Sequence, residues 1–234
     1  DGINCHQWRW MAHNWQVAYE KLPTRVLGAT IIWSDAALDA EFDDYVAYRT
    51  PPPHRLCSEL MRRGAPLLSI LNVDDVAVAQ GCLLVPRPEL LPEEERRRVL
   101  TYGGGPVVTI GRDEPGRLSC TVYDRGEQVR AFSTLLPEQL PDDMPEPPNY
   151  LYGIYSQPVD EAFYQAVTEL LIELSGAPVV TNDVTDARLL AYETAPDRLR
   201  LLIGNEAHYY IIPQVDVHHE IVEVTAASHF PRKQ

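Results

Sequence analysis

The chain has 234 residues, of which 45% are hydrophobic and 23% are charged, as in a folded protein with one large domain or two small ones. Its net charge of −14 and its pI near 4.8 argue against binding to nucleic acid or to an anionic membrane, because both require a positive surface. No apolar run approaches the roughly 20 residues of a membrane-spanning helix, and no signal peptide is visible. We therefore expect no membrane partner and no nucleic-acid partner.

The four cysteines are widely separated and include no CxxC pair, so the sequence indicates neither a zinc ribbon nor a thioredoxin-type site. In a chain of this length they favour buried free thiols over a disulfide scaffold. Unpaired thiols in turn favour a cytoplasmic location. The residues are Cys5, Cys57, Cys82 and Cys120.

Residues 5–22 are predicted to form an amphipathic helix, because apolar side chains recur there at the spacing of one helical face. The stripe consists of Trp8, Met11, Trp15, Ala18 and Leu22, and Pro23 ends the helix. The sequence also begins without a methionine and stops directly after a strand-like segment. Such ends are typical of a fragment; a natural stand-alone protein is the alternative.

Strand-like and helix-like segments alternate over the next hundred residues. Helices are predicted at 54–63, closed by Gly64, and from Pro92 to the turn at Gly103-Gly104-Gly105. The glycines follow a helix and precede a strand, so they indicate a tight turn and not a phosphate-binding loop. Buried strands that alternate with helices predict an α/β fold with a doubly wound, mostly parallel sheet. The predicted strands are Val26–Trp33, Pro66–Val73, Cys82–Val85 and Pro106–Gly111.

The last third of the chain has a different pattern. A proline-rich acidic connector at 137–148 leads to a predicted helix at about 159–175, which Gly176 caps. Closely spaced short strands follow, and they predict a small antiparallel β domain. These strands are Pro178–Thr181, Ala187–Thr194, Arg198–Gly204, Tyr209–Val215 and Glu220–Ala226.

Two segments carry a resemblance to a known family. The stretch from "ATIIWSDAALDAEFDDYVAYR" through "RLCSELMRRGAPLLSILNVDDV" to "GCLLVPRPELLPEEERRRVLTYGGGPVVTIG" resembles the trimerisation domain of bacterial β-galactosidases of the forty-second glycoside hydrolase family. The stretch "RLRLLIGNEAHYYIIPQVDV" resembles the small β-sandwich that follows it in those enzymes. The resemblance implies that the sheet is flavodoxin-like or class I amidotransferase-like. It divides the chain into a terminal barrel helix at 1–24, the α/β domain at 25–177 and an incomplete β-sandwich at 178–234.

The resemblance implies a non-catalytic accessory and oligomerisation module of a carbohydrate-active enzyme. The expected partners are a catalytic barrel domain or chain, further copies of the same chain, and carbohydrate. An amidotransferase needs a cysteine nucleophile after a strand, whereas the last α/β strand is followed by Gly111-Arg112-Asp113-Glu114-Pro115. No carboxylate pair is assignable to glycoside hydrolysis. We therefore assign no catalytic residue, cofactor or metal to this chain, and we expect the parent protein to be a glycoside hydrolase.

The segment 33–49 is the candidate carbohydrate-contacting site. It follows the first predicted strand, and ligands of doubly wound folds bind at the carboxyl ends of strands. Aromatic rings with carboxylates and an arginine suit the faces and hydroxyls of sugars. The candidate residues are Trp33, Asp35, Asp43, Asp44, Tyr45 and Arg49. The alternative is a surface helix whose acids are only solvated.

Two further clusters have structural interpretations. Tyr150, Tyr152 and Tyr155 lie beside the proline-rich connector and are predicted to seal a seam between domains or to meet a partner subunit. His218, His219 and Glu220 are consecutive, so their side chains alternate between the faces of a strand and do not converge on a metal. Two other functions stay open: a free-standing carbohydrate-binding or scaffold protein, and a small hydrolase with an unrecognised acidic pair.

Overall fold

The computed structural model describes residues 9, 12, 16, 23–37, 40–41, 51–114, 116–136, 160–181, 184, 187–205 and 209–224. Within the predicted amphipathic segment, Arg9, Ala12 and Gln16 are helical and exposed. The apolar stripe predicted for that helix lies outside the described residues, as does the tyrosine cluster at 150–155. None of the helices in the described part of the chain is long and apolar enough to cross a membrane.

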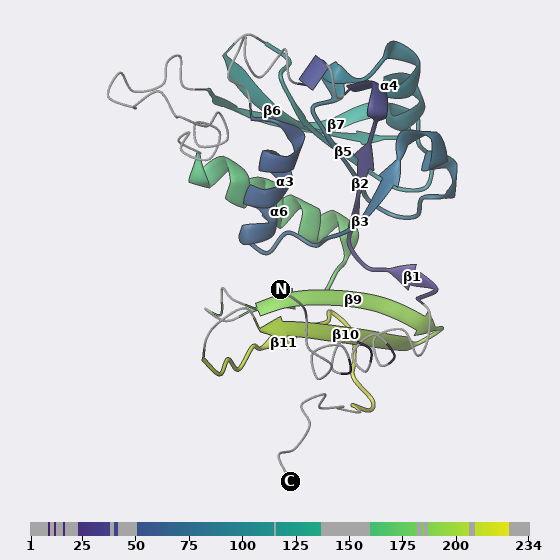
Figure 1. Cartoon of the computed structure of the whole chain (residues 1–234), viewed down its shortest axis with the longest axis vertical. Coiled ribbons are helices and arrows are strands. Elements are labelled where there is room, and N and C mark those ends of the chain that lie inside the picture. Colours follow the sequence, from purple (N-terminus) through teal and green to yellow (C-terminus); the bar gives the residue numbers. More distant parts are fainter. Residues whose placement is uncertain are drawn as a thin grey trace.

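A six-stranded mixed sheet forms the larger part of the structure (Figure 1). Its strands stand in the order β3-β2-β4-β5-β6-β7. The first four strands of this order run parallel to one another, as the apolar runs predicted. They are β2 (Ala29–Trp33), β3 (Leu67–Asn72), β4 (Leu83–Pro86) and β5 (Val107–Gly111).

Helices cover both faces of this sheet (Figure 1). On one face, α3 (Pro53–Arg62) and α6 (Glu161–Ser175) bury Leu56, Leu60, Val167 and Leu171 against side chains of the sheet. On the other face, α4 (Glu93–Leu100) and the 3-10 helix η2 (Val73–Val78) pack on Ile32, Leu83 and Val85. Two shorter 3-10 helices, η1 (Asp35–Ala37) and η3 (Pro88–Leu90), follow β2 and β4.

The sheet continues into an antiparallel hairpin that the sequence analysis did not predict. Strand β6 (Arg117–Asp124) pairs with β5, and β7 (Glu127–Leu135) pairs with β6. Arg125 and Gly126 form the tip with φ angles of 50° and 88°, the left-handed pair that a two-residue hairpin turn requires. The sheet is therefore less uniformly parallel than expected, and the described fold is a mixed α/β arrangement with additional antiparallel sheets.

The last part of the chain is antiparallel, as predicted, but with fewer strands. Strand β9 (Ala187–Ala195) lies between β10 (Arg198–Asn205) and the short β1 (Arg25–Val26). The predicted strand Val26–Trp33 is therefore wrong in its extent, because Val26 pairs with β9 and only Ala29–Trp33 enters the main sheet. Figure 1 shows this antiparallel unit beside the α/β part, joined to it through β1.

The predicted strands Tyr209–Val215 and Glu220–Ala226 are also wrong in extent. Among the described residues of these two segments, the strand that forms is β11 (Val215–Asp216), paired with β8 (Val179–Val180), and residues 220–224 are not in a strand. Two local features account for the loss. Pro213 has no N–H to donate to a ladder, and His218 has a φ of 56°, which turns the backbone out of an extended path.

Candidate functional site at the carboxyl edge of the parallel strands

The carboxyl ends of the parallel strands form one row. In register, Trp33 of β2 stands opposite Asn72 of β3, and Pro86 of β4 stands opposite Ile110 of β5. The chain leaves β2 for β3 on one side and then crosses to β4 on the other side of β2. The edge between β2 and β4 is therefore the point where the direction of winding changes, and such a point is where parallel sheets open a ligand crevice.

Trp33 and Asp35 lie at this edge, as the sequence predicted. The indole N–H of Trp33 donates to Asp35 Oδ1 at 2.8 Å, while the ring side chain remains 38% exposed. The intervening Ser34 is buried, and its hydroxyl donates to Glu95 Oε2 of α4 at 2.6 Å. Ser34 is thus fixed to the α4 face, so alternation places Trp33 toward the α3 face. The result is an exposed aromatic ring whose orientation is held by a hydrogen bond on its own segment.

Arg87 is a residue of this edge that the sequence analysis missed. It follows β4 between two prolines, and it adopts a left-handed conformation with φ and ψ of 59°. Its side chain is completely buried. The guanidinium donates to Glu89 Oε1 at 2.6 Å and to the carbonyl of Pro51, just before α3, at 3.2 Å. The only sequence signal was the unusual Pro-Arg-Pro-Glu run directly after an apolar strand.

Glu89 links Arg87 to the end of β5. Its Oε1 also accepts the backbone N–H of Arg112 at 2.9 Å. A Cβ placed on Gly111 would come within 2.2 Å of Glu89 Oε2, so this carboxylate occupies the space directly over the glycine. Glu89 Oε2 is buried and has no hydrogen-bond partner among the described residues. The end of β5 is therefore occupied by Gly111 and by the carboxylate of Glu89 that lies over it.

A second polar pair lies at the start of α3. His54 Nδ1 and Glu41 Oε1 are 3.7 Å apart, and the imidazole is about half exposed. Burial raises the pKa of Glu41, and nearby His54 and Arg87 partly oppose that rise. Glu41 belongs to the predicted 33–49 segment, although it was not among the residues chosen as sugar contacts.

Of the six predicted contact residues, only Trp33 and Asp35 can be placed; the other four, Asp43, Asp44, Tyr45 and Arg49, lie outside the described residues. In the part of the chain that the structure covers, no group of three His, Cys, Asp or Glu side chains converges on a possible metal position. His218 faces Asp216 at 3.3 Å, a local pair that shares its turn.

The three described cysteines are buried free thiols, as expected. Burial raises the pKa of Cys57, Cys82 and Cys120 to about 12. A thiol attacks only as its thiolate, so these side chains are poor nucleophiles near neutral pH. Comparisons of the chain with protein-family models, curated proteins and solved structures found no match.

Proposed function

We propose that this chain is a non-catalytic accessory module of a carbohydrate-active enzyme of the β-galactosidase type, and that its carboxyl edge helps to wall a sugar pocket. The observation that carries the proposal is the Trp33 indole, which is exposed yet oriented by its 2.8 Å hydrogen bond to Asp35. An indole held in this way presents an apolar face to a sugar ring, and the second carboxylate oxygen of Asp35 can accept a hydrogen bond from a sugar hydroxyl.

The strand order supports the finer fold assignment. Numbered along the chain, the four parallel strands stand in the order 2-1-3-4, which is the order of flavodoxin-like sheets, and helices cover both faces. We infer that the α/β part is a doubly wound domain of the amidotransferase-like type that the sequence resembles. In this assignment the β-rich part corresponds to a β-sandwich that follows the domain.

The chemistry of the edge favours a wall over a catalytic centre. Glu89 Oε1 accepts hydrogen bonds from Arg87 and from the backbone N–H of Arg112, and Glu89 Oε2 is buried. This carboxylate therefore has a structural role in the turn after β4. The described thiols are protonated at neutral pH because burial raises their pKa. Catalysis would then belong to a barrel domain or chain, with further copies of this chain in a cytoplasmic assembly.

The proposal is tested by titrating the chain with D-galactose and with lactose while following the indole N–H signals in NMR spectra. We expect one indole signal to shift in a saturable manner, and Trp33→Ala to remove that signal together with binding. Trp33→Phe keeps a ring but loses the tether to Asp35, so binding should weaken by about tenfold or less. Val129→Ala on β7, an exposed apolar position away from the edge, is the matched control. Unchanged sugar affinity in Trp33→Ala would remove the pocket-wall role.

A further inference from the structure

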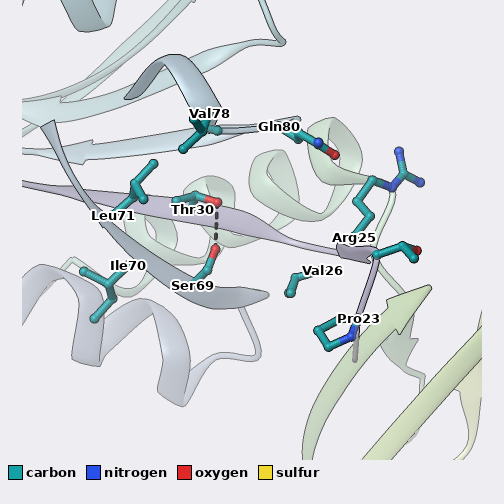
Figure 2. A pocket seen from close by; sticks show the side chains of 11 residues that line it. Pro23, Arg25, Val26, Thr30, Ser69, Ile70, Leu71, Val78 and Gln80 are labelled. Atoms are coloured by element: carbon teal, nitrogen blue, oxygen red, sulfur yellow. Dashed lines mark hydrogen bonds between the residues drawn. The ribbon is translucent and has the colours of Figure 1, made fainter. Parts of the chain in front are cut away.

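A groove of about 260 Å³ lies beside Thr30 of β2 and Ser69 of β3, where the segment around β1 approaches the main sheet (Figure 2). One wall is formed by Pro23 and by Val26 of β1, and the other by Val78, the last residue of η2, and by Gln80 just after it. Its floor is made by the first half of β2 and by the edge strand β3. Because β1 is tied to β9 and the floor belongs to the main sheet, the groove lies where the two parts of the molecule meet.

The floor of the groove carries two hydroxyls where a covered parallel sheet is normally apolar. Thr30 of β2 and Ser69 of β3 are cross-strand partners, and their side-chain oxygens are 2.7 Å apart. Further along the same face, Ile32 and Leu71 pack under η2 and α4. The helices η2 and α4 therefore cover Ile32 and Leu71 but not Thr30 and Ser69. One hydroxyl donates to the other, which leaves one O–H and several lone pairs for a ligand.

The positive charge of Arg25 at the groove is neutralised by an ion pair with Glu193. Among the described residues of the lining, Arg25 alone has a charged side chain, and its guanidinium donates to Glu193 Oε1 at 2.7 Å. Val26, Leu71 and Val78 supply aliphatic surface, and Figure 2 shows the amide of Gln80 at the rim above the hydroxyl pair. The lining therefore offers neutral hydrogen-bonding groups on a floor between aliphatic walls.

We propose that this groove is a binding site for a small uncharged hydroxylated ligand the size of a single sugar ring. Its volume falls just below the range for drug-sized ligands, which fits one ring and not an oligosaccharide. A sugar ring combines hydroxyls, which match Thr30, Ser69 and Gln80, with a C–H face, which matches the aliphatic walls. The groove is open on one side, so affinity in the millimolar range is expected. The inference does not rest on the proposed function, because neither Trp33 nor Asp35 is among the described residues that line the groove.

The test is a titration of the full chain with D-galactose and with D-glucose, followed in two-dimensional amide NMR spectra. Saturable shifts are expected at the amides of Thr30, Ser69 and Gln80. Ser69→Ala should weaken this binding about fivefold, the usual effect of losing one neutral hydrogen bond. Ser133→Ala on β7, which removes an exposed hydroxyl that is bonded to Arg117, should leave it unchanged. Gln80→Ala changes only an exposed side chain, so it tests the rim even if Ser69→Ala disturbs folding.

Two results would overturn the assignment. One is the absence of saturable shifts around the groove with either sugar, whatever happens at Trp33. The other is equal sugar affinity in the wild type, Ser69→Ala and Gln80→Ala. The hydrogen bond between Thr30 and Ser69 would then only stabilise the pairing of β2 with β3. Shifts confined to the Trp33 indole would support the proposed pocket wall while refuting the groove. Shifts confined to the groove would do the opposite, so the two proposals fail separately.

Discussion

At the scale of single residues, the triple glycine after α4 shows how a turn can be fixed by contacts and not only by backbone freedom. A Cβ on Gly105 would lie 2.4 Å from the carbonyl oxygen of Gly81, and a Cβ on Gly104 would meet the ring of Tyr102. At Gly103 nothing lies within 4 Å, and its φ is not positive. A tight turn was predicted here, and the structure adds that a side chain at Gly105 would strike the backbone of Gly81, whereas one at Gly104 would have to displace the ring of Tyr102.

We therefore predict opposite outcomes for two neighbouring substitutions. Gly105→Ala should lower the free energy of unfolding by about 1–3 kcal/mol, because the Gly81 carbonyl that it strikes belongs to the backbone and must move. Gly103→Ala should be neutral or slightly stabilising, since it removes freedom only from the unfolded chain. Urea denaturation of both variants checks the prediction. Equal destabilisation would mean that Gly105 does not approach Gly81 as described.

At the scale of elements, the contact between α3 and α6 depends on one buried carboxylate. Glu59 is 3% exposed; its Oε2 accepts a hydrogen bond from Arg63 at 2.8 Å, and its Oε1 forms an ion pair with Arg55 Nε at 3.1 Å. Arg63 also reaches Glu161 in the first turn of α6, and its guanidinium lies 5.1 Å from the centre of the Tyr164 ring. These carboxylates hold the pKa of Arg63 above its usual value despite the opposing effect of partial burial.

Glu59→Gln should therefore destabilise the fold by about 3 kcal/mol, because it removes the negative charge beside the buried guanidinium of Arg55 and the mostly buried guanidinium of Arg63. The matched control is Arg62→Ala, which removes an exposed arginine 3.6 Å from the same carboxylate. That control should cost less than about 1 kcal/mol, as for a solvent-exposed pair. Thermal and urea unfolding of the two variants would contradict the account if their stabilities were similar.

The N-cap of α6 predicts how the stability of the fold changes with pH. Asp160 is the N-cap: its Oδ1 accepts the N–H groups of Ala162 and Phe163, and its Oδ2 accepts the hydroxyl of Thr134 on β7. The hydroxyl contributes most, and together these bonds lower the pKa of Asp160 below its usual value. A lowered folded-state pKa stabilises the protein above the unfolded-state pKa of about 3.9, and the contribution disappears as pH falls through the lower folded value.

The stability difference between the wild type and Asp160→Asn should accordingly be constant near neutral pH and shrink as the solution is acidified below about pH 4. Thr134→Val, which removes the main hydrogen bond to the carboxylate, should shift the decline to higher pH. The urea midpoints of the wild type and both variants, measured from neutral pH to below about pH 4, test this prediction. A difference that grows on acidification would show that Asp160 is not stabilised as its anion.

The sequence predicted the parallel strands and their helices because each one buries an unbroken apolar run. It did not predict the β6–β7 hairpin, because β7 is exposed along most of its length. Arg125 and Gly126 form the turn at its tip. Trp33 and Asp35 could be chosen because ligand sites follow parallel strands. The contacts of Arg87 with Glu89 and Pro51 could not, since they depend on the register of β4 and β5 and on where the chain enters α3.

At the scale of the whole molecule, the two described hydrophobic clusters both lie in the α/β part, one on each face of the main sheet. The antiparallel part contributes buried Ala191 and Tyr192, but many of its apolar side chains are exposed, including Tyr210, Ile212 and Val222. A few short strands rarely fold alone in water without further apolar burial. This asymmetry agrees with the proposal that the chain works within a larger assembly.

The central claim, that the chain serves a carbohydrate-active enzyme without being its catalyst, is tested most directly by native mass spectrometry of the protein from its source. The same fraction is assayed for hydrolysis of a chromogenic β-galactoside. The account predicts that these residues occur in a longer chain, or in a complex with one, and that this species hydrolyses the galactoside while the 26.4 kDa chain alone does not. A lone 26.4 kDa species without a partner, or turnover by that species, would contradict it.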